Sequence, residues 1–484
     1  MAAQSIPIPP TNSGGKAPRW TQPVSFYGQS VFSKYYAQSI CVFLMLVPFL
    51  VMPVASQQTP IDNSGCVANY DAAVDYFPSK IHVDNGALFS VRYEKNYKVV
   101  TNTAPGQNVS YVLTQCGTPA PNPSLFSNTT LFFEVPIKNA ASIATTAVAY
   151  VEMLGRRSAL KAVDTEGLVS SPCVQLGLEK GEIKGLEDKN LTLRADQFNA
   201  VALVFSTFGS EPGTAKKTVV TSEVTDPGPL NRAEWLEFYS TFFNLEAPAQ
   251  DLTAAINNNY NCFKSAANAK ANKPVVAWAS FTAASDFNKN TASWSFSPAA
   301  YKRILTEDAG ATFFNGTTKA SFATAAEFAA AAATVDVLID ETFVGDSWTA
   351  FLQNYGLTEA SDLKFVKNKA VFRQDGLVNP NDGRDWFASA VAMDDAVLQD
   401  VIRAVHPEVL PSKVAYNWIR NVATETKQVL TAANCTQTDA NKPVPDRALV
   451  CKDIKLDGDK SAAGKTVASA LTAVLGLLAI AMSF

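Results

Sequence analysis

The stretch Asn231-Arg-Ala-Glu-Trp-Leu-Glu-Phe-Tyr-Ser-Thr-Phe-Phe243 decides the fold. Its large aromatic residues recur at i, i+3, i+4 and i+7, the spacing that places side chains on one face of a helix. These residues are Trp235, Phe238, Tyr239 and Phe242. Residues 249–267 are also helical in character. Because a helix of 20 residues is about 30 Å long, we expect this stretch to connect two domains.

On both sides of this stretch, strand-like and helix-like segments alternate. Before it we predict a hairpin over residues 89–100 that turns at 94–96, strands at 160–163 and 200–205, and a helix that ends at Gly155. After it we predict strands at 274–279, 335–339 and 370–372, and helices at 298–306, 322–333 and 394–405. Such alternation indicates mostly parallel sheets. The prediction is an α/β fold of two Rossmann-like lobes, joined by a long interdomain helix, with a ligand cleft between the lobes.

The N-terminal region predicts export from the cell. Residues 40–55 are apolar and follow a leader that carries Lys16, Arg19 and Lys34 but no acidic residue. A run of this length suits the core of a signal peptide, with cleavage before Gln57. An uncleaved signal anchor is the alternative.

The C-terminal region predicts a lipid anchor. Residues 467–484 are apolar apart from Ser and Thr, and the small residues Ser461-Ala-Ala463 precede them. Small residues, a polar spacer and a terminal apolar tail form the signal for a GPI anchor. We predict attachment at Ser461, with Gly458 as the alternative residue and a plain transmembrane helix as the alternative interpretation. The predicted location is the extracellular face of the plasma membrane.

These features divide the chain into seven predicted segments. They are a leader and signal peptide (1–56), an N-terminal extension (57–80), an N-terminal α/β lobe (81–228), a helical linker (229–270), a C-terminal α/β lobe (271–410), a C-terminal extension with a disulfide (411–461) and the GPI signal (462–484).

The cysteines and sequons agree with export. Cys41 lies in the signal segment, and an even number of cysteines remains: Cys66, Cys116, Cys173, Cys262, Cys435 and Cys451. Six cysteines in an exported chain predict three disulfides, for which 15 pairings exist. The sequence also predicts glycosylation at Asn108, Asn128, Asn190, Asn315 and Asn434.

Composition and motifs exclude several classes of function. The 484 residues include 40 Lys and Arg against 44 Asp and Glu, without a long basic run, so we predict no nucleic-acid partner. Histidine is the commonest metal ligand and general base, and the chain has only His82 and His406, which we expect to be structural. Neither a G-x-S-x-G nor a G-x-G-x-x-G motif occurs. We therefore predict that the protein is not an enzyme and needs no metal or other cofactor.

Several runs resemble the class III substrate-binding proteins of bacterial ABC importers. The resemblance covers roughly residues 80–410, and its most specific run is 229–260. The other runs are 97–100, 111–121, 135–136, 142–155, 335–339, 366–372 and 406–408. It implies capture of a ferric siderophore, haem or cobalamin in the cleft, with little lobe closure. A GPI-anchored form need not have the bacterial permease, so the implied downstream partner is a permease, a surface reductase or an endocytic receptor.

The resemblance implies that aromatic and Arg side chains from both lobes hold the ligand. In the first lobe, Thr145 and Thr146 stand where a strand turns into a helix, and they suit either ligand contact or simple N-capping. In the second lobe, Trp278 and Phe281 follow a strand, and core packing is their alternative role.

Two further groups complete the predicted ligand site. Trp294 and Phe296 are placed in a polar loop, where an aromatic side chain is a better contact candidate than in a periodic run. Arg373, Arg384 and Trp386 surround a turn-rich loop after a strand. The alternative is a surface loop in which Arg384 pairs with a neighbouring Asp.

The sequence therefore predicts a cell-surface binding protein that captures a small metal chelate, most specifically a ferric siderophore, for uptake. Cobalamin or haem binding is one alternative. A structural or adhesion ectodomain that keeps the fold, and a secreted hydrolase, are two others.

Overall fold

The computed structural model describes residues 65–164, 166–316, 319 and 321–453. The predicted signal peptide and GPI signal lie outside these residues. The chain divides into two units, 1–57 and 58–484, and every described residue belongs to the second. Among the described residues, no helix combines the length and the apolar character needed to cross a membrane.

The N-terminal half contains two sheets. A sheet in the order β1-β2-β3-β4 begins with the predicted hairpin, and a five-stranded sheet in the order β7-β6-β5-β8-β9 is parallel throughout. The strands are β1 Phe89–Tyr93, β2 Tyr97–Asn102, β3 Val109–Gln115, β4 Leu131–Val135, β5 Ala140–Ser142, β6 Leu160–Val163, β7 Lys184–Gly185, β8 Leu203–Ser206 and β9 Thr218–Val220. The helices are α1 Thr145–Met153, α2 Pro172–Glu179 and α3 Leu191–Asn199.

The C-terminal half is built around a sheet in the order β11-β10-β13-β14-β16, in which β10, β13 and β14 are parallel and the outer strands antiparallel. Its strands are β10 Val275–Thr282, β11 Ser293–Phe296, β12 Thr312–Phe313, β13 Val337–Asp340, β14 Val371–Arg373 and β16 Arg420–Asn421, and β15 Leu377–Val378 pairs separately with β17 Gln428–Val429. The helices are α6 Ala300–Asp308, α7 Ala325–Ala331, α8 Trp348–Asn354, α9 Lys364–Lys367 and α10 Asp394–Val405. The predicted α/β class is confirmed.

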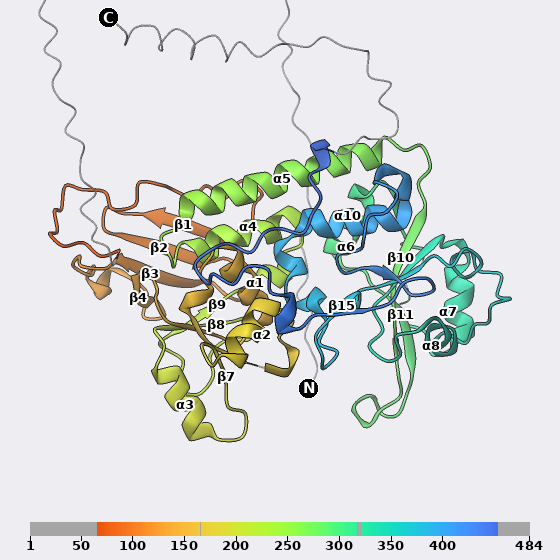
Figure 1. Ribbon diagram of the computed structural model, residues 1–484, viewed down its shortest axis with the longest axis horizontal. Coiled ribbons are helices and arrows are strands. Elements are labelled where there is room, and N and C mark those ends of the chain that lie inside the picture. Colours follow the sequence, from red (N-terminus) through yellow and green to blue (C-terminus); the bar gives the residue numbers. More distant parts are fainter. Residues whose placement is uncertain (1–64, 165, 317–318, 320, 454–484) are drawn as a thin grey trace, which may run out of the picture. The chain divides into compact units, whose positions relative to one another are not determined.

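The predicted linker is two helices, α4 Pro229–Ser240 and α5 Glu246–Asn268. All four aromatic residues of the predicted stripe are fully buried, but only Trp235, Phe238 and Tyr239 lie on α4, because Phe242 stands in the turn that follows it. Helix α5 packs against α4 and also against α10 and α6 of the C-terminal half (Figure 1). The linker therefore contacts both halves along its length.

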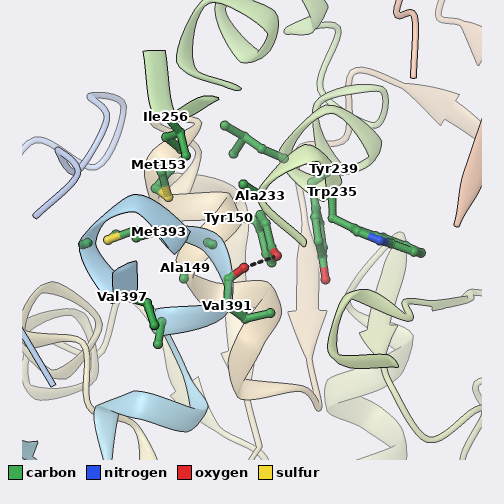
Figure 2. Close-up of a cluster of buried hydrophobic side chains, with 14 of the residues drawn as sticks. Ala149, Tyr150, Met153, Ala233, Trp235, Tyr239, Ile256, Val391, Met393 and Val397 are labelled. Atoms are coloured by element: carbon green, nitrogen blue, oxygen red, sulfur yellow. Dashed lines mark hydrogen bonds between the residues drawn. The ribbon is translucent and has the colours of Figure 1, made fainter. Parts of the chain in front are cut away.

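One hydrophobic core extends through both halves. Figure 2 shows side chains of α1, α4, α5 and α10 meeting the short helix η8 Ala390–Ala392. The Tyr150 hydroxyl donates a hydrogen bond to the carbonyl of Val391 at 3.0 Å. Since burial of apolar surface is the main stabilising contribution, this shared core holds the two lobes together rather than letting them swing on a free linker.

The six cysteines form the three predicted disulfides. The pairs are Cys66–Cys116, Cys173–Cys435 and Cys262–Cys451. All five predicted glycosylation residues are exposed, as a glycan requires, and their modification stays a prediction. His406 is buried at the end of α10, where its Nε2 lies 3.0 Å from the carbonyl oxygen of Gly310, whereas His82 is exposed.

Candidate functional site: a cavity beneath the C-terminal strap

Residues 411–453, the C-terminal strap, run back across the body of the protein (Figure 1). After β17, the strap is bonded to α2 by the disulfide Cys173–Cys435. It next contacts the end of α1, where Val444 N–H donates to the carbonyl of Glu152 at 2.9 Å. It ends on α5 at the disulfide Cys262–Cys451. Because β16 and β17 of the strap also pair with β14 and β15, the strap is fixed to both halves of the protein.

A cavity of about 370 Å³ lies under this strap. Its walls come from α1, the start of α2, the segment 385–393 and the strap itself. Most of the lining is apolar, including Val148, Met153, Val169, Leu377, Met393 and Leu430. Ligand pockets are concave, mostly apolar and about 300–1,000 Å³ in volume, so this cavity suits a compact ligand.

One buried acid at the cavity wall is Asp385, at the start of helix η7 Asp385–Phe387. Its carboxylate accepts hydrogen bonds from Ser170 Oγ at 2.6 Å and Trp418 Nε1 at 2.8 Å, and it pairs with Arg447. Burial alone would raise the pKa of Asp385, but the Arg447 charge and these hydrogen bonds outweigh it and hold the pKa below its usual value. The carboxylate is thus ionised and joins first-lobe, second-lobe and strap residues.

Glu152, on α1, also lines the cavity and differs from Asp385. Burial raises its pKa, and the Ser171 hydroxyl and Arg157 offset this only in part. The Arg157 guanidinium lies 3.4 Å from the Glu152 carboxylate and donates to the carbonyl of Gln437 in the strap at 2.7 Å. Two of the acids that line the cavity therefore differ: Asp385 is ionised, whereas burial favours the protonated form of Glu152.

The predicted first-lobe contacts, Thr145 and Thr146, divide between two environments. Thr145 lines the cavity, and its hydroxyl donates to the carbonyl of Phe387 at 3.4 Å. Thr146 is buried and donates to Glu223. The N-capping interpretation is wrong for both, because α1 begins with Thr145 and its N-cap is Ala144, which makes no side-chain cap.

The predicted aromatic contacts of the second lobe are packed against their neighbours. Trp278 is fully buried and donates from Nε1 to Thr306 at 2.9 Å. The placement of Trp294 and Phe296 in a loop is wrong, because both belong to β11, which pairs with β10. The serines of Ser293–Phe296 alternate with aromatic residues at the period of two that a half-buried strand requires. Phe281 packs on Trp294, with ring centroids 5.2 Å apart.

The predicted arginines also have different roles. Arg373 is buried and pairs with Asp340 and Asp375. Arg384 donates from one nitrogen, Nη2, to the carbonyl of Thr342 at 2.7 Å, instead of pairing with a neighbouring Asp. Its other terminal nitrogen, Nη1, is buried without a hydrogen-bond partner.

Arg384 also lies beside exposed aromatic rings. The guanidinium is 4.6 Å from the ring centroid of Phe343, and Phe343 stacks on Phe387 at 5.7 Å. These two rings are 72% and 45% exposed, high values for phenylalanine. Trp386 is half-buried, and its ring centroid lies 6.3 Å from that of Trp278. Of the predicted residues, Thr145, Arg384 and Trp386 thus lie at or beside the 384–387 segment that borders the cavity.

The sequence did not reveal the strap's part in this site. Asp385, Arg447 and Glu152 carry no motif, and residues 411–447 show no regular apolar period. The one signal was the even number of cysteines, which indicated that Cys435 and Cys451 bond back to the body without saying where.

Comparisons with known proteins give fold-level likeness only. No family model and no curated protein matches the chain. The solved structures similar to it include periplasmic binding proteins. One from Veillonella parvula is 12% identical, covers 58% of this chain and 88% of its own, and has a TM-score of 0.43. A periplasmic heme-binding protein from Pseudomonas aeruginosa is 12% identical, covers 60% of this chain and 99% of its own, and has a TM-score of 0.42. An ABC-type Fe3+-hydroxamate transport protein from Saccharomonospora viridis is 15% identical, covers 57% of this chain and 95% of its own, and has a TM-score of 0.39. At these scores no argument about the ligand rests on the likeness.

Proposed function

We propose that this chain is a solute-binding protein that holds a compact, largely apolar molecule in the cavity beneath the strap and carries out no chemistry on it. The observation that carries this proposal is the cavity itself, which has about 370 Å³, an apolar lining and a few fixed polar groups. That combination is typical of small-molecule sites. The shared core and the doubly bonded strap preorganise the site, which lowers the ordering cost of binding.

An iron chelate is the ligand class to which we extend the proposal. Siderophores present hydroxamate or catecholate oxygens around the metal, and an Arg guanidinium pairs well with such anionic oxygens. The buried, unpartnered Nη1 of Arg384 can make that bond, and the exposed rings of Phe343 and Phe387 can cover an apolar face of the chelate. A large chelate, haem or cobalamin would occupy the cavity only in part and extend along the 384–387 segment.

We propose further that the protein acts at the cell surface as a glycosylated, GPI-anchored ectodomain. The three disulfides support an oxidising compartment. The leader, the tail and the sequons of the sequence support export and anchoring. Release of the protein from intact cells by phosphatidylinositol-specific phospholipase C would test the anchor, and retention on the cells would contradict it.

The binding experiment is a titration of the purified protein with a ferric hydroxamate, a ferric catecholate, haem and cobalamin. Tryptophan fluorescence reports on the cavity because Trp418 donates a hydrogen bond to Asp385 in the cavity wall. We expect saturable quenching by one ligand at micromolar concentration or below.

Two variants locate the bound molecule. Ala388→Trp places a large side chain in the cavity and should weaken binding at least tenfold, whereas Ala255→Trp, on the exposed face of α5, should leave it unchanged. Arg384→Gln should weaken an anionic chelate more than a neutral solute. If neither of the two ferric siderophores nor haem binds, the iron-chelate proposal is refuted. Equal binding by Ala388→Trp and wild type would refute the cavity as the site.

A further inference from the structure

A second cavity, of about 480 Å³, lies between helix α10 and the strap. Residues 411–417, Arg447 and Leu449 form the strap side of its wall, and Gln399 of α10 forms the other side. This second cavity adjoins the first, because residues 415–417 and Arg447 line both. Its volume is in the range of small-molecule pockets, and the solute proposal makes no use of it.

A buried amide donor at this wall has no partner. Gln399 is only 2% exposed, and its side-chain oxygen accepts the backbone N–H of Leu449 at 2.8 Å. Because a backbone N–H can only donate, this bond fixes which end of the amide is the oxygen. The other end, Nε2, makes no hydrogen bond to any described residue. Nearly all buried polar groups are hydrogen-bonded, so a spare donor at a cavity wall indicates an acceptor on a ligand.

The two cations of the wall also have unused donors. Arg447 binds Asp385 through Nη1, whereas its Nε and Nη2 donate to no residue in the described part of the chain. Lys413 is exposed, and within the same ranges it makes neither an ion pair nor a hydrogen bond. Arg and Lys side chains can donate but not accept. The free hydrogen-bonding capacity of Gln399, Arg447 and Lys413 is therefore all of one kind.

The charge of the wall has one sign as well. Of the residues that the structure describes, no acid lines the second cavity. Asp400 of α10 is bonded to the strap nearby, but its carboxylate accepts the backbone N–H groups of Asn417, Trp418 and Ile419. The remaining wall is mostly apolar and includes Pro411, Val414, Ala415, Leu449 and the Tyr416 ring. Two cations, a spare amide donor and apolar walls favour an anion on an apolar body.

We propose that the second cavity binds a small organic carboxylate. The carboxylate accepts hydrogen bonds from Arg447, Gln399 and Lys413, and the apolar body of the ligand packs against the other wall residues. Nε and Nη2 form one edge of the guanidinium, and such an edge binds a carboxylate through two parallel hydrogen bonds. Asp385 holds Nη1 on the other side and so orients this edge before the ligand arrives.

The direct test is calorimetric titration of the protein with benzoate and with hexanoate, and separately with benzamide. Benzamide keeps the ring of benzoate but carries no charge. We expect one carboxylate per chain, with a dissociation constant of about 1 mM or below. Benzamide should bind at least about tenfold more weakly, because it lacks the charge-assisted hydrogen bonds.

Matched variants locate the carboxylate. Lys413→Met changes an exposed side chain and should weaken benzoate binding about fivefold. Gln399→Glu keeps an acceptor for the Leu449 N–H but places a negative charge at the wall, and it should weaken binding at least about tenfold. Lys442→Met, an exposed strap lysine outside both cavities, should change nothing.

Three results would overturn the proposal. They are no binding of either carboxylate up to about 10 mM, equal binding of benzoate and benzamide, and wild-type binding by both Lys413→Met and Gln399→Glu. Ala388→Trp fills the first cavity and should leave benzoate binding within about twofold; loss of binding in that variant would place the carboxylate in the first cavity and also overturn the proposal. The solute titration depends on the first cavity, so a failure here leaves the solute proposal standing.

Discussion

Arg373 was predicted as a ligand contact, yet its surroundings predict a large effect on stability. The side chains of Arg373 and Asp340 are 1% and 0% exposed. Asp375 has a second cation, since Arg420 pairs with it at 2.8 Å. Asp340 has no other ion pair among the described residues, although Thr342 and Tyr355 donate hydrogen bonds to it. Replacing Arg373 by Leu would therefore leave Asp340 as a buried, uncompensated charge.

The expected cost follows from that difference. Removing one partner of a buried ion pair costs about 3–5 kcal/mol. Because Asp340 keeps its other hydrogen bonds, we expect a cost near the lower end of this range, about 3 kcal/mol. Urea denaturation followed by circular dichroism measures this as a decrease in the free energy of unfolding. Because Arg373 does not line the cavity, solute affinity in the folded protein should stay within a factor of about two of wild type.

A double variant separates the charge from the lost packing. Adding Asp340→Leu to Arg373→Leu replaces the pair by apolar groups and should recover most of the loss, since such replacements are often neutral. Arg303→Leu is the exposed control: its partner Glu307 lies one helical turn away, and such pairs contribute about 0.3–0.5 kcal/mol. A cost for Arg373→Leu no larger than that of Arg303→Leu, or no recovery in the double variant, would refute the reasoning.

Three further predictions concern the linker helices, the shared core and the strap. The free energy of unfolding should decrease as pH rises from about 4.5 to about 8, because burial raises the pKa of Glu237 to about 8 in the folded protein. Over this range the folded protein holds a proton that the unfolded chain releases. Glu237→Gln should flatten this slope in urea titrations at several pH values. Tyr150→Phe removes a hydroxyl whose single proton can be donated to the carbonyl of Arg232 or of Val391. It should cost about 1–3 kcal/mol in the same assay, whereas no loss would mean that water replaces the hydroxyl. Replacing Cys173 and Cys435 by serine opens a loop of 262 residues. The double variant should lose about 2–5 kcal/mol of its free energy of unfolding and bind the solute more weakly. Unchanged affinity would show that the strap does not form the site.

Periodicity made much of the fold predictable. The helical stripe of α4 and the apolar strands β6, β13 and β14 are local patterns, because a side chain's burial there depends on its position within one element. The boundaries of α10 were predicted to the residue, since Asp394 and Pro407 mark its two ends chemically. The error at Trp294 has a related cause: β11 is only four residues long, too short for alternation to stand out from a loop.

The site was harder to predict because its walls come from segments far apart in sequence. Six cysteines indicated that distant segments are tied together, but 15 pairings were open, and only some of them bring residues 428–447 onto α1 and α2. The pairing Cys173–Cys435 does so, and it places the strap beside Asp385. Charge was no better a guide, because Asp385 and Arg373 carry no distinguishing pattern in the sequence. Their charged partners Arg447 and Asp340 stand 62 and 33 positions away. A binding site assembled in this way depends on the strap, so the disulfide variants are also the sharpest available test of where the solute binds.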